Sequence, residues 1–157
     1  MVLSIKKILY PTDFSEQATR ALGYAREMAE KFGAELHCLH VLDEMYYNWL
    51  MDDELGLRID YKEVDFHVKA EEQMEAFMER HFGAERDKVI TQIVKGRPYM
   101  EIVRYAQEKE IDLIVMATHG HGALASMLLG SVAEKVIRKS PCAVLLVRQA
   151  DHKTEIN

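Results

Sequence analysis

Apolar and polar positions along this chain follow two periods, one typical of strands and one typical of helices. Short apolar runs are separated by longer stretches in which apolar residues recur at i, i+3, i+4 and i+7, the spacing of an amphipathic helix. Five strands alternating with four helices predict an α/β fold, a doubly wound domain whose mainly parallel sheet is covered on both faces. The predicted strands are 5–10, 35–42, 89–94, 111–117 and 142–147.

The first helix has the clearest amphipathic pattern. It opens after Asp13, and Gly33 is well placed as the left-handed residue that follows its last turn. The second helix is predicted over 63–82 and is followed by Gly83. The apolar stripe of the first helix comprises Ala18, Ala21, Leu22, Ala25, Met28, Ala29 and Phe32, and that of the second comprises Ala70, Met74, Phe77, Met78 and His81.

The two later helices are marked by proline and by a capping pattern. Pro98 suits the first turn of the third helix, where a missing N–H costs nothing. Ser131 and Glu134 form the Ser-x-x-Glu pattern of a capped helix start, and Pro141 ends this fourth helix. The inner face of the third helix is predicted to be formed by Tyr99, Ile102, Val103 and Ala106.

The segment from Asp43 to Asp60 shows no regular period. Aromatic residues such as Tyr46 and Trp49 stand in it among acidic ones. A stretch of about 18 residues without regular structure is long for a compact domain and is typical of a functional segment. We predict that it covers a binding pocket or a partner surface, and packing against its own chain is the alternative.

Composition limits the classes of partner. The chain has 157 residues, enough for one domain, predicted over 1–150, with a polar tail at 151–157 that frays. With 26 acidic and 20 basic residues its net charge is −6, which argues against binding to nucleic acid or anionic membranes. No apolar run approaches a membrane span, and the N-terminus does not resemble a signal peptide. Cys38 and Cys142 share no metal or redox spacing, which suits a reducing cytoplasm.

The stretch 111–141 carries the strongest chemical signal, because it predicts a strand, a glycine-containing loop and a helix start. Gly120, Gly122 and Gly130 let backbone approach closely, and the first N–H groups of a helix attract an anion such as phosphate. Plain turn glycines are the alternative reading. The loop lacks the Gly-Lys-Ser/Thr of a Walker A motif. It also lacks the acidic residue about 20 positions on that a dinucleotide fingerprint requires.

These residues resemble the universal stress protein family. Gly120, nine residues and then Gly130-Ser131 match its Gly-x2-Gly-x9-Gly-Ser/Thr signature, with Ala117 in place of the first glycine. The Pro-Thr-Asp ending at Asp13 and the strand end at Val41 extend the resemblance over nearly the whole chain. The resemblance implies a Rossmann-like sheet of order 3-2-1-4-5, in which Asp13 faces Gly120.

The resemblance also implies an ATP site, with or without Mg²⁺, and a homodimer formed by pairing the strand Cys142–Val147 across a two-fold axis. Asp13 would contact ribose or adenine, the backbone of Val41 would contact adenine, and the glycine loop would hold the phosphates. The implied nucleotide-binding positions are Pro11, Thr12, Asp13, Val41, Met116, Ala117, His119, Gly120, Gly130, Ser131 and Val132.

Other interpretations of the same residues remain open at this stage. Asp13 and Ser131 each match the form of a helix cap, a role compatible with binding. His119 and His121 could be ligands of a metal ion. No third ligand has diagnostic spacing, so no metal site is predicted. No nucleophile has an adjacent base, so dedicated catalysis is not predicted. The predicted function is a nucleotide-dependent regulatory module in a stress response; the alternatives are a dimeric interaction protein that binds no nucleotide and a slow ATP hydrolase.

Overall fold

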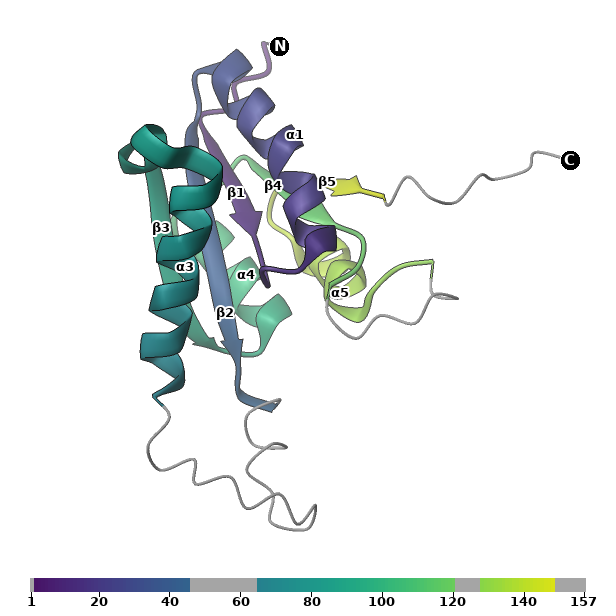
Figure 1. Ribbon diagram of the computed structural model, residues 1–157. Coiled ribbons are helices and arrows are strands. Elements are labelled where there is room, and N and C mark those ends of the chain that lie inside the picture. The colour runs from purple at the N-terminus through teal and green to yellow at the C-terminus, as the bar shows by residue number, and fades with distance from the viewer. Residues whose placement is uncertain (1, 46–64, 121–127, 149–157) are drawn as a thin grey trace, which may run out of the picture.

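The computed structural model describes residues 2–45, 65–120 and 128–148, which form an α/β domain (Figure 1). Strands and helices alternate along the chain, with one 3₁₀ helix between α3 and β3. The elements are β1 (Lys7–Pro11), α1 (Glu16–Phe32), β2 (Glu35–Asp43), α3 (Phe66–Phe82), η3 (Gly83–Lys88), β3 (Val89–Gly96), α4 (Pro98–Glu108), β4 (Leu113–Ala117), α5 (Ser131–Lys139) and β5 (Ala143–Val147).

The five strands form one sheet in the order β3-β2-β1-β4-β5, with every neighbouring pair parallel. The predicted fold class and the strand order implied by the family resemblance are therefore confirmed. Because parallel strands need crossover connections, a helix follows each of the first four strands and covers the sheet. The direction of winding reverses between β1 and β4.

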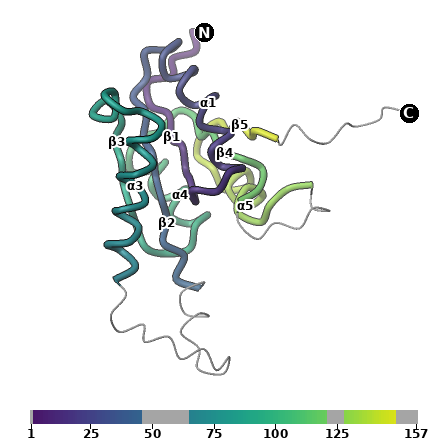
Figure 2. Tube along the Cα trace, viewed as in Figure 1, coloured from purple at the N-terminus to yellow at the C-terminus, as the bar shows by residue number. Residues whose placement is uncertain are grey.

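Two apolar layers enclose the sheet. Tyr10 of β1 packs with Leu22 of α1 and Phe77 of α3 on one face. Leu9, its neighbour in β1, packs with Ile102 of α4 and with α5 on the other face, as the alternation of side chains along a strand requires. The ribbon and the tube both show α1 and α3 in front of the sheet and α4 and α5 behind it (Figures 1 and 2).

The C-terminal ends of α1 and α4 share one backbone motif. Gly33, predicted to follow α1, has a left-handed backbone with φ 61°. The N–H groups of Gly33 and Ala34 donate to carbonyl oxygens in the last turn of α1. Glu110 takes the equivalent position after α4 with φ 56°. The N–H of Glu110 donates to Gln107 at 3.3 Å and that of Ile111 donates to Ala106 at 2.9 Å.

Neither of the two helix caps that the sequence pattern allows, at Asp13 and at Ser131, is formed. α1 is capped by Ser15, whose hydroxyl accepts the N–H of Ala18 at 3.1 Å, and not by Asp13. The N-cap of α5 is Gly130, and Ser131 is already the first helical residue, without a side-chain capping bond. A capping side chain must sit on a residue with extended backbone, and Gly130 has that backbone with φ −69° and ψ 156°.

The predicted start of α4 is confirmed, and its predicted inner face is confirmed in part. Pro98 begins α4 as predicted, and Ile102 and Ala106 are buried, but the pattern missed Tyr105, which is buried as well. Tyr46–Asp60, His121 and the tail 151–157 lie outside the described residues. Among the helices that the structure describes, none is long and apolar enough to span a membrane.

Candidate functional site

The carboxyl ends of β1 and β4 separate at the centre of the sheet. Their register pairs are Ile8 with Leu113 and Leu9 with Ile114, and beyond these β1 continues beside β2 while β4 continues beside β5. In open α/β sheets, ligands bind outside the carboxyl ends of the strands at the point where the winding reverses. This gap between β1 and β4 is therefore the candidate site.

Asp13 and Gly120 come together across this gap, as the family resemblance implies. A β-carbon added at Gly120 would lie 3.3 Å from Cγ of Asp13 and nearer still to its Oδ2. Any larger residue at this position would therefore displace the carboxylate. The absence of a side chain at Gly120 therefore leaves room for the Asp13 carboxylate in this position.

A tight turn connects β1 to α1 and fixes the backbone around Asp13. The N–H of Thr12 donates to the carbonyl of Leu39 at 2.9 Å, and the N–H of Phe14 donates to Oγ1 of Thr12 at 3.0 Å. Oδ1 of Asp13 accepts the N–H of Ser15 at 3.0 Å. Phe14 is left-handed with φ 62°, which is unfavourable for a residue with a bulky side chain. The turn leaves Oδ2 of Asp13 beside Gly120.

The start of α5 is held against the end of β4. The N–H of Gly130 donates to the carbonyl of Thr118 at 2.7 Å, and the N–H of Thr118 donates to the carbonyl of Val147 at 3.1 Å. A β-carbon at Gly130 would lie 2.8 Å from that Thr118 oxygen, so only glycine allows this approach. The packing brings the N-terminus of α5, with the N–H groups of Ser131 and Val132, to the carboxyl end of the sheet.

The remaining predicted site residues lie near the ends of β1, β2 and β4 or just after β4. Pro11 ends β1 and is buried, Val41 lies near the end of β2 and is half-buried, and Met116 and Ala117 end β4 and are buried. Nδ1 of His119 lies 2.9 Å from Oγ1 of Thr118.

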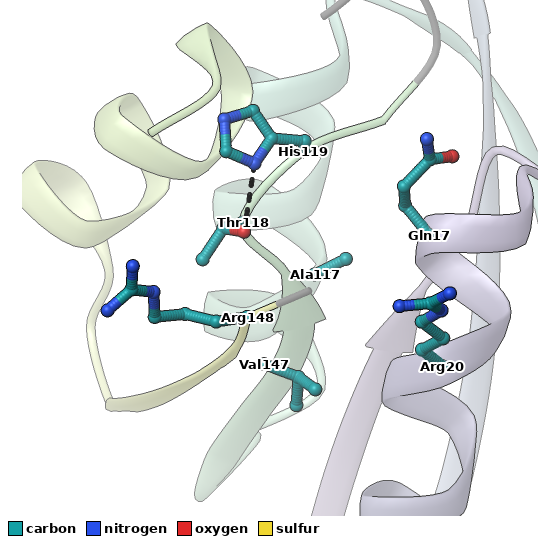
Figure 3. Close-up of a pocket in the computed structure, with 7 residues that line it drawn as sticks. All are labelled: Gln17, Arg20, Ala117, Thr118, His119, Val147 and Arg148. Atoms are coloured by element: carbon teal, nitrogen blue, oxygen red, sulfur yellow. Dashed lines mark hydrogen bonds between the residues drawn. The ribbon is translucent and has the colours of Figure 1, made fainter. Parts of the chain in front are cut away.

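A small pocket lies on the α1 side of the β4 end (Figure 3). Its free volume is about 10 Å³, roughly the space that one water molecule needs. The methyl group of Ala117 points towards Gln17 and Arg20 of α1, and Ala117 belongs to the apolar layer between α1 and the sheet (Figure 3). The residue that departs from the family signature therefore faces α1. The pocket is lined by Gln17, Arg20, Ala117, Thr118, His119, Val147 and Arg148.

His40 lies within the predicted strand 35–42, and the structure gives it a contact with the site. It is buried in β2, and its Nδ1 lies 2.8 Å from the carbonyl oxygen of Thr12. Its ring centroid lies 4.4 Å from that of Phe14. The sequence contains no signal for this contact, because 28 residues separate His40 from Thr12 and no spacing motif links them.

Neither cysteine is placed to act as a nucleophile. Burial raises the pKa of the Cys38 thiol to about 12. Burial also raises the pKa of Cys142, an effect that the Ser140 hydroxyl opposes. Both groups therefore stay protonated near neutral pH, whereas a reactive cysteine is a thiolate. Among the residues that the structure describes, no three His, Cys, Asp or Glu side chains are grouped to hold a metal ion.

The arrangement offers two different kinds of polar group at one edge. The ionised carboxylate of Asp13 only accepts hydrogen bonds, so it suits a hydroxyl donor and disfavours an anion beside it. The N-terminus of α5 offers N–H donors and the positive end of the helix dipole, which suit an anion. A ligand that carries hydroxyl groups at one point and an anionic group at another matches this pair.

Comparison with known proteins identifies relatives over almost the full chain. Residues 4–148 match the model of the universal stress protein family. Universal stress protein MJ0577 of Methanocaldococcus jannaschii is 37% identical over 159 residues, which cover 95% of this chain and 98% of that protein.

Solved structures give the same result. The structure of MJ0577 superimposes with a TM-score of 0.75 at 36% identity and covers 96% of this chain and 100% of that one. Universal stress protein UspA from Lactobacillus plantarum gives 0.73 at 26% identity, with 94% and 100% covered. A universal stress protein solved in complex with cAMP shares the fold, with a TM-score of 0.57 at 21% identity and 93% and 98% covered.

Proposed function

This chain belongs to the universal stress protein family, and we propose that it binds ATP in the gap between β1 and β4 and acts as a nucleotide-dependent regulatory module. The observation that carries the proposal is the placement of Asp13 against Gly120, beside the N-terminus of α5. A nucleotide has ribose hydroxyls for the carboxylate and phosphates for the helix N-terminus. Its two ends therefore match the two kinds of group at this edge.

Each part of the nucleotide has a group suited to it. The ribose lies at Asp13, because a carboxylate oxygen accepts a hydrogen bond from a ribose hydroxyl. The adenine lies beside the backbone of Val41 at the end of β2. The phosphates lie at the N–H groups of Ser131 and Val132, which as the first residues of α5 have no partner within the helix. Mg²⁺, where present, is carried with the phosphates.

Binding of ATP is tested by purifying the protein, denaturing it and identifying any released nucleotide by mass spectrometry. Calorimetric titration of nucleotide-free protein with ATP, ADP, AMP and adenosine, with and without Mg²⁺, then ranks the groups that contribute to affinity. We expect ATP to bind more tightly than adenosine, because charge-assisted hydrogen bonds contribute about 1.5–3 kcal/mol each. Absence of both co-purified nucleotide and measurable binding would overturn the proposal and leave the interaction protein as the function.

The edge strand β5 supports a second part of the proposal, a homodimer. β5 is the last strand of the sheet, Ala143 is exposed and Val144, Leu145 and Leu146 are only half-buried. An apolar edge strand without a charge or proline promotes aggregation unless something covers it. Antiparallel pairing of β5 with the same strand of a second copy satisfies its free ladder groups and covers these side chains.

A further inference from the structure

His40 makes two contacts with the turn that carries Asp13. Its Nδ1 lies 2.8 Å from the carbonyl oxygen of Thr12, and a carbonyl oxygen only accepts, so Nδ1 carries the proton and donates. The N–H of the same Thr12 donates to Leu39, the residue before His40. β2 therefore holds both polar groups of the Thr12 backbone, immediately before Asp13.

The conformation of Phe14, immediately after Asp13, is stabilised by packing against neighbouring aromatic rings. Its left-handed backbone is unfavourable for a phenylalanine, so packing must hold it in place. The Phe14 ring lies between the ring of His40, 4.4 Å away, and the ring of Phe77 in α3, 5.5 Å away. His40 thus contacts the residues on both sides of Asp13.

We propose that His40 is a positioning residue that holds the Asp13 carboxylate in its orientation at Gly120. The inference rests on the proposed nucleotide site, in which Asp13 receives the ribose. His40 acts through the turn: its hydrogen bond fixes the peptide before Asp13 and makes the main contribution, while its ring packs on Phe14, the residue after it. When the bond is lost, the buried Thr12 carbonyl has no donor, the turn relaxes and Asp13 loses its place beside Gly120.

Three variants at position 40 separate the hydrogen bond from the ring contact. His40→Asn keeps an N–H donor close to the Nδ1 position, His40→Gln moves the donor to the Nε2 position, and His40→Phe keeps a ring without a donor. We expect Asn to bind ATP within about threefold of the wild type, and Gln and Phe to bind about tenfold more weakly, the effect of one lost hydrogen bond. Equal affinities for the Asn and Gln variants, or wild-type affinity for the Phe variant, would overturn the proposal.

His37 supplies a matched control on the same strand. It is buried on the opposite face of β2, with Nδ1 2.7 Å from the hydroxyl of Tyr105 and Nε2 2.6 Å from Glu35. His37→Phe removes a buried hydrogen-bonded histidine without touching the Asp13 turn. We expect it to lower stability and leave ATP affinity unchanged. A matching loss of affinity in His37→Phe would show that general destabilisation explains the His40 result.

Two further measurements connect His40 to Asp13 itself. In an Asp13→Ala background, His40→Phe is expected to change ATP affinity by less than about twofold. His40 acts on affinity through Asp13, so the effects of the two substitutions on binding free energy are not additive. In nucleotide-free protein, amide exchange at Ser15 reports the bond from Ser15 to Asp13. We expect His40→Phe to accelerate this exchange and His40→Asn to preserve its protection.

The exchange measurement distinguishes this proposal from the proposed function. If the wild type binds no nucleotide, the function fails while exchange at Ser15 still tests whether His40 holds Asp13. If the wild type binds ATP and Ser15 keeps its protection in His40→Phe, the positioning role fails and the nucleotide site stands.

Discussion

The carboxylate of Asp13 occupies the space that the missing side chain of Gly120 leaves free, with Cγ 3.3 Å from the position of an added β-carbon. The two residues lie on loops that follow β1 and β4, and 107 positions of the sequence separate them. Their contact joins the two strand ends that separate at the centre of the sheet. It also means that mutations at either residue act on both.

Gly120→Ala is expected to displace Asp13 and weaken ATP binding about tenfold or more, because the added methyl group overlaps the carboxylate and disturbs the charge-assisted hydrogen bond that we propose between Asp13 and the ribose. The measurement is calorimetric titration with ATP, with denaturant unfolding as the test of stability. Gly23→Ala is the matched control, since an added β-carbon there meets nothing within 4 Å. In the middle of α1 this change should stabilise the protein by about 0.5–1 kcal/mol and leave affinity unchanged. An unaltered affinity in Gly120→Ala would contradict the role of this contact.

Ala117→Gly restores the glycine of the family signature, and we expect no gain in affinity. The methyl group of Ala117 is buried in the layer between α1 and the sheet, so its removal does not enlarge the proposed phosphate site. The variant should lose about 1 kcal/mol of stability, from the lost methyl group and the added freedom of the chain. Tighter ATP binding in the same titration would show instead that the methyl group crowds the ligand.

Val144→Lys tests the proposed dimer, because it places a charge on the half-buried face of the edge strand β5. We expect analytical ultracentrifugation to show a dimer for the wild type and a shift towards monomer for the variant, since an interface disfavours an unpaired buried charge. Val68→Lys on α3 is the control, because Val68 is already 46% exposed and lies away from β5. A wild type that stays monomeric at micromolar concentration would refute the dimer.

Glu110→Gly is expected to stabilise the protein by about 0.5–1 kcal/mol, because the left-handed residue after α4 is not a glycine and a β-carbon is unfavourable there. Gly33 already fills the same position after α1. Thermal or denaturant unfolding measures the change. Gly33→Ala should show the opposite sign, and a loss of stability in Glu110→Gly would indicate that the glutamate side chain makes a contribution of its own.

Alkaline pH is expected to destabilise the fold through its buried acidic groups. Burial raises the pKa of Cys38 to about 12 from an ordinary value of 9.0, and burial raises that of Tyr10 as well. A folded-state pKa above the unfolded value means that the stabilisation is complete below about pH 9 and is lost as the pH rises towards 12. Each such proton contributes a slope of up to about 1.4 kcal/mol per pH unit. Cys38→Ala should show a shallower decline in urea unfolding between pH 9 and 11, and an unchanged slope would contradict the assignment.

Sequence reasoning succeeded where local physics decides the structure. The apolar stripe of α1, the left-handed Gly33 and the position of Pro98 depend on neighbours within a few residues. Periodicity gave the alternation of strands and helices, but it gave no order of strands, which came from the family resemblance. The closeness of Asp13 to Gly120 depends on that order and was foreseen for the same reason.

The failures share a different cause. Asp13 and Ser131 both match the form of a cap, but the cap belongs to the residue whose backbone is extended, and tertiary contacts decide which residue that is. Tyr105 is buried in the apolar layer behind the sheet, where its hydroxyl meets His37, 68 residues away. His40 likewise gains its role from Thr12, across two elements of the fold. No local pattern contains these pairings.

The short pairing of β1 with β4 is a weak connection between two parts of the sheet. The three strands on one side and the two on the other are joined by two register pairs at this seam, whereas β2 and β3 share eight. Opening of the seam breaks few ladder bonds together, so we expect it to be among the easier partial openings of the domain. A molecule that binds across this seam contacts both parts of the sheet and raises the free energy of that opening. A ligand bound in this gap would therefore stabilise the sheet against separation of β1 from β4.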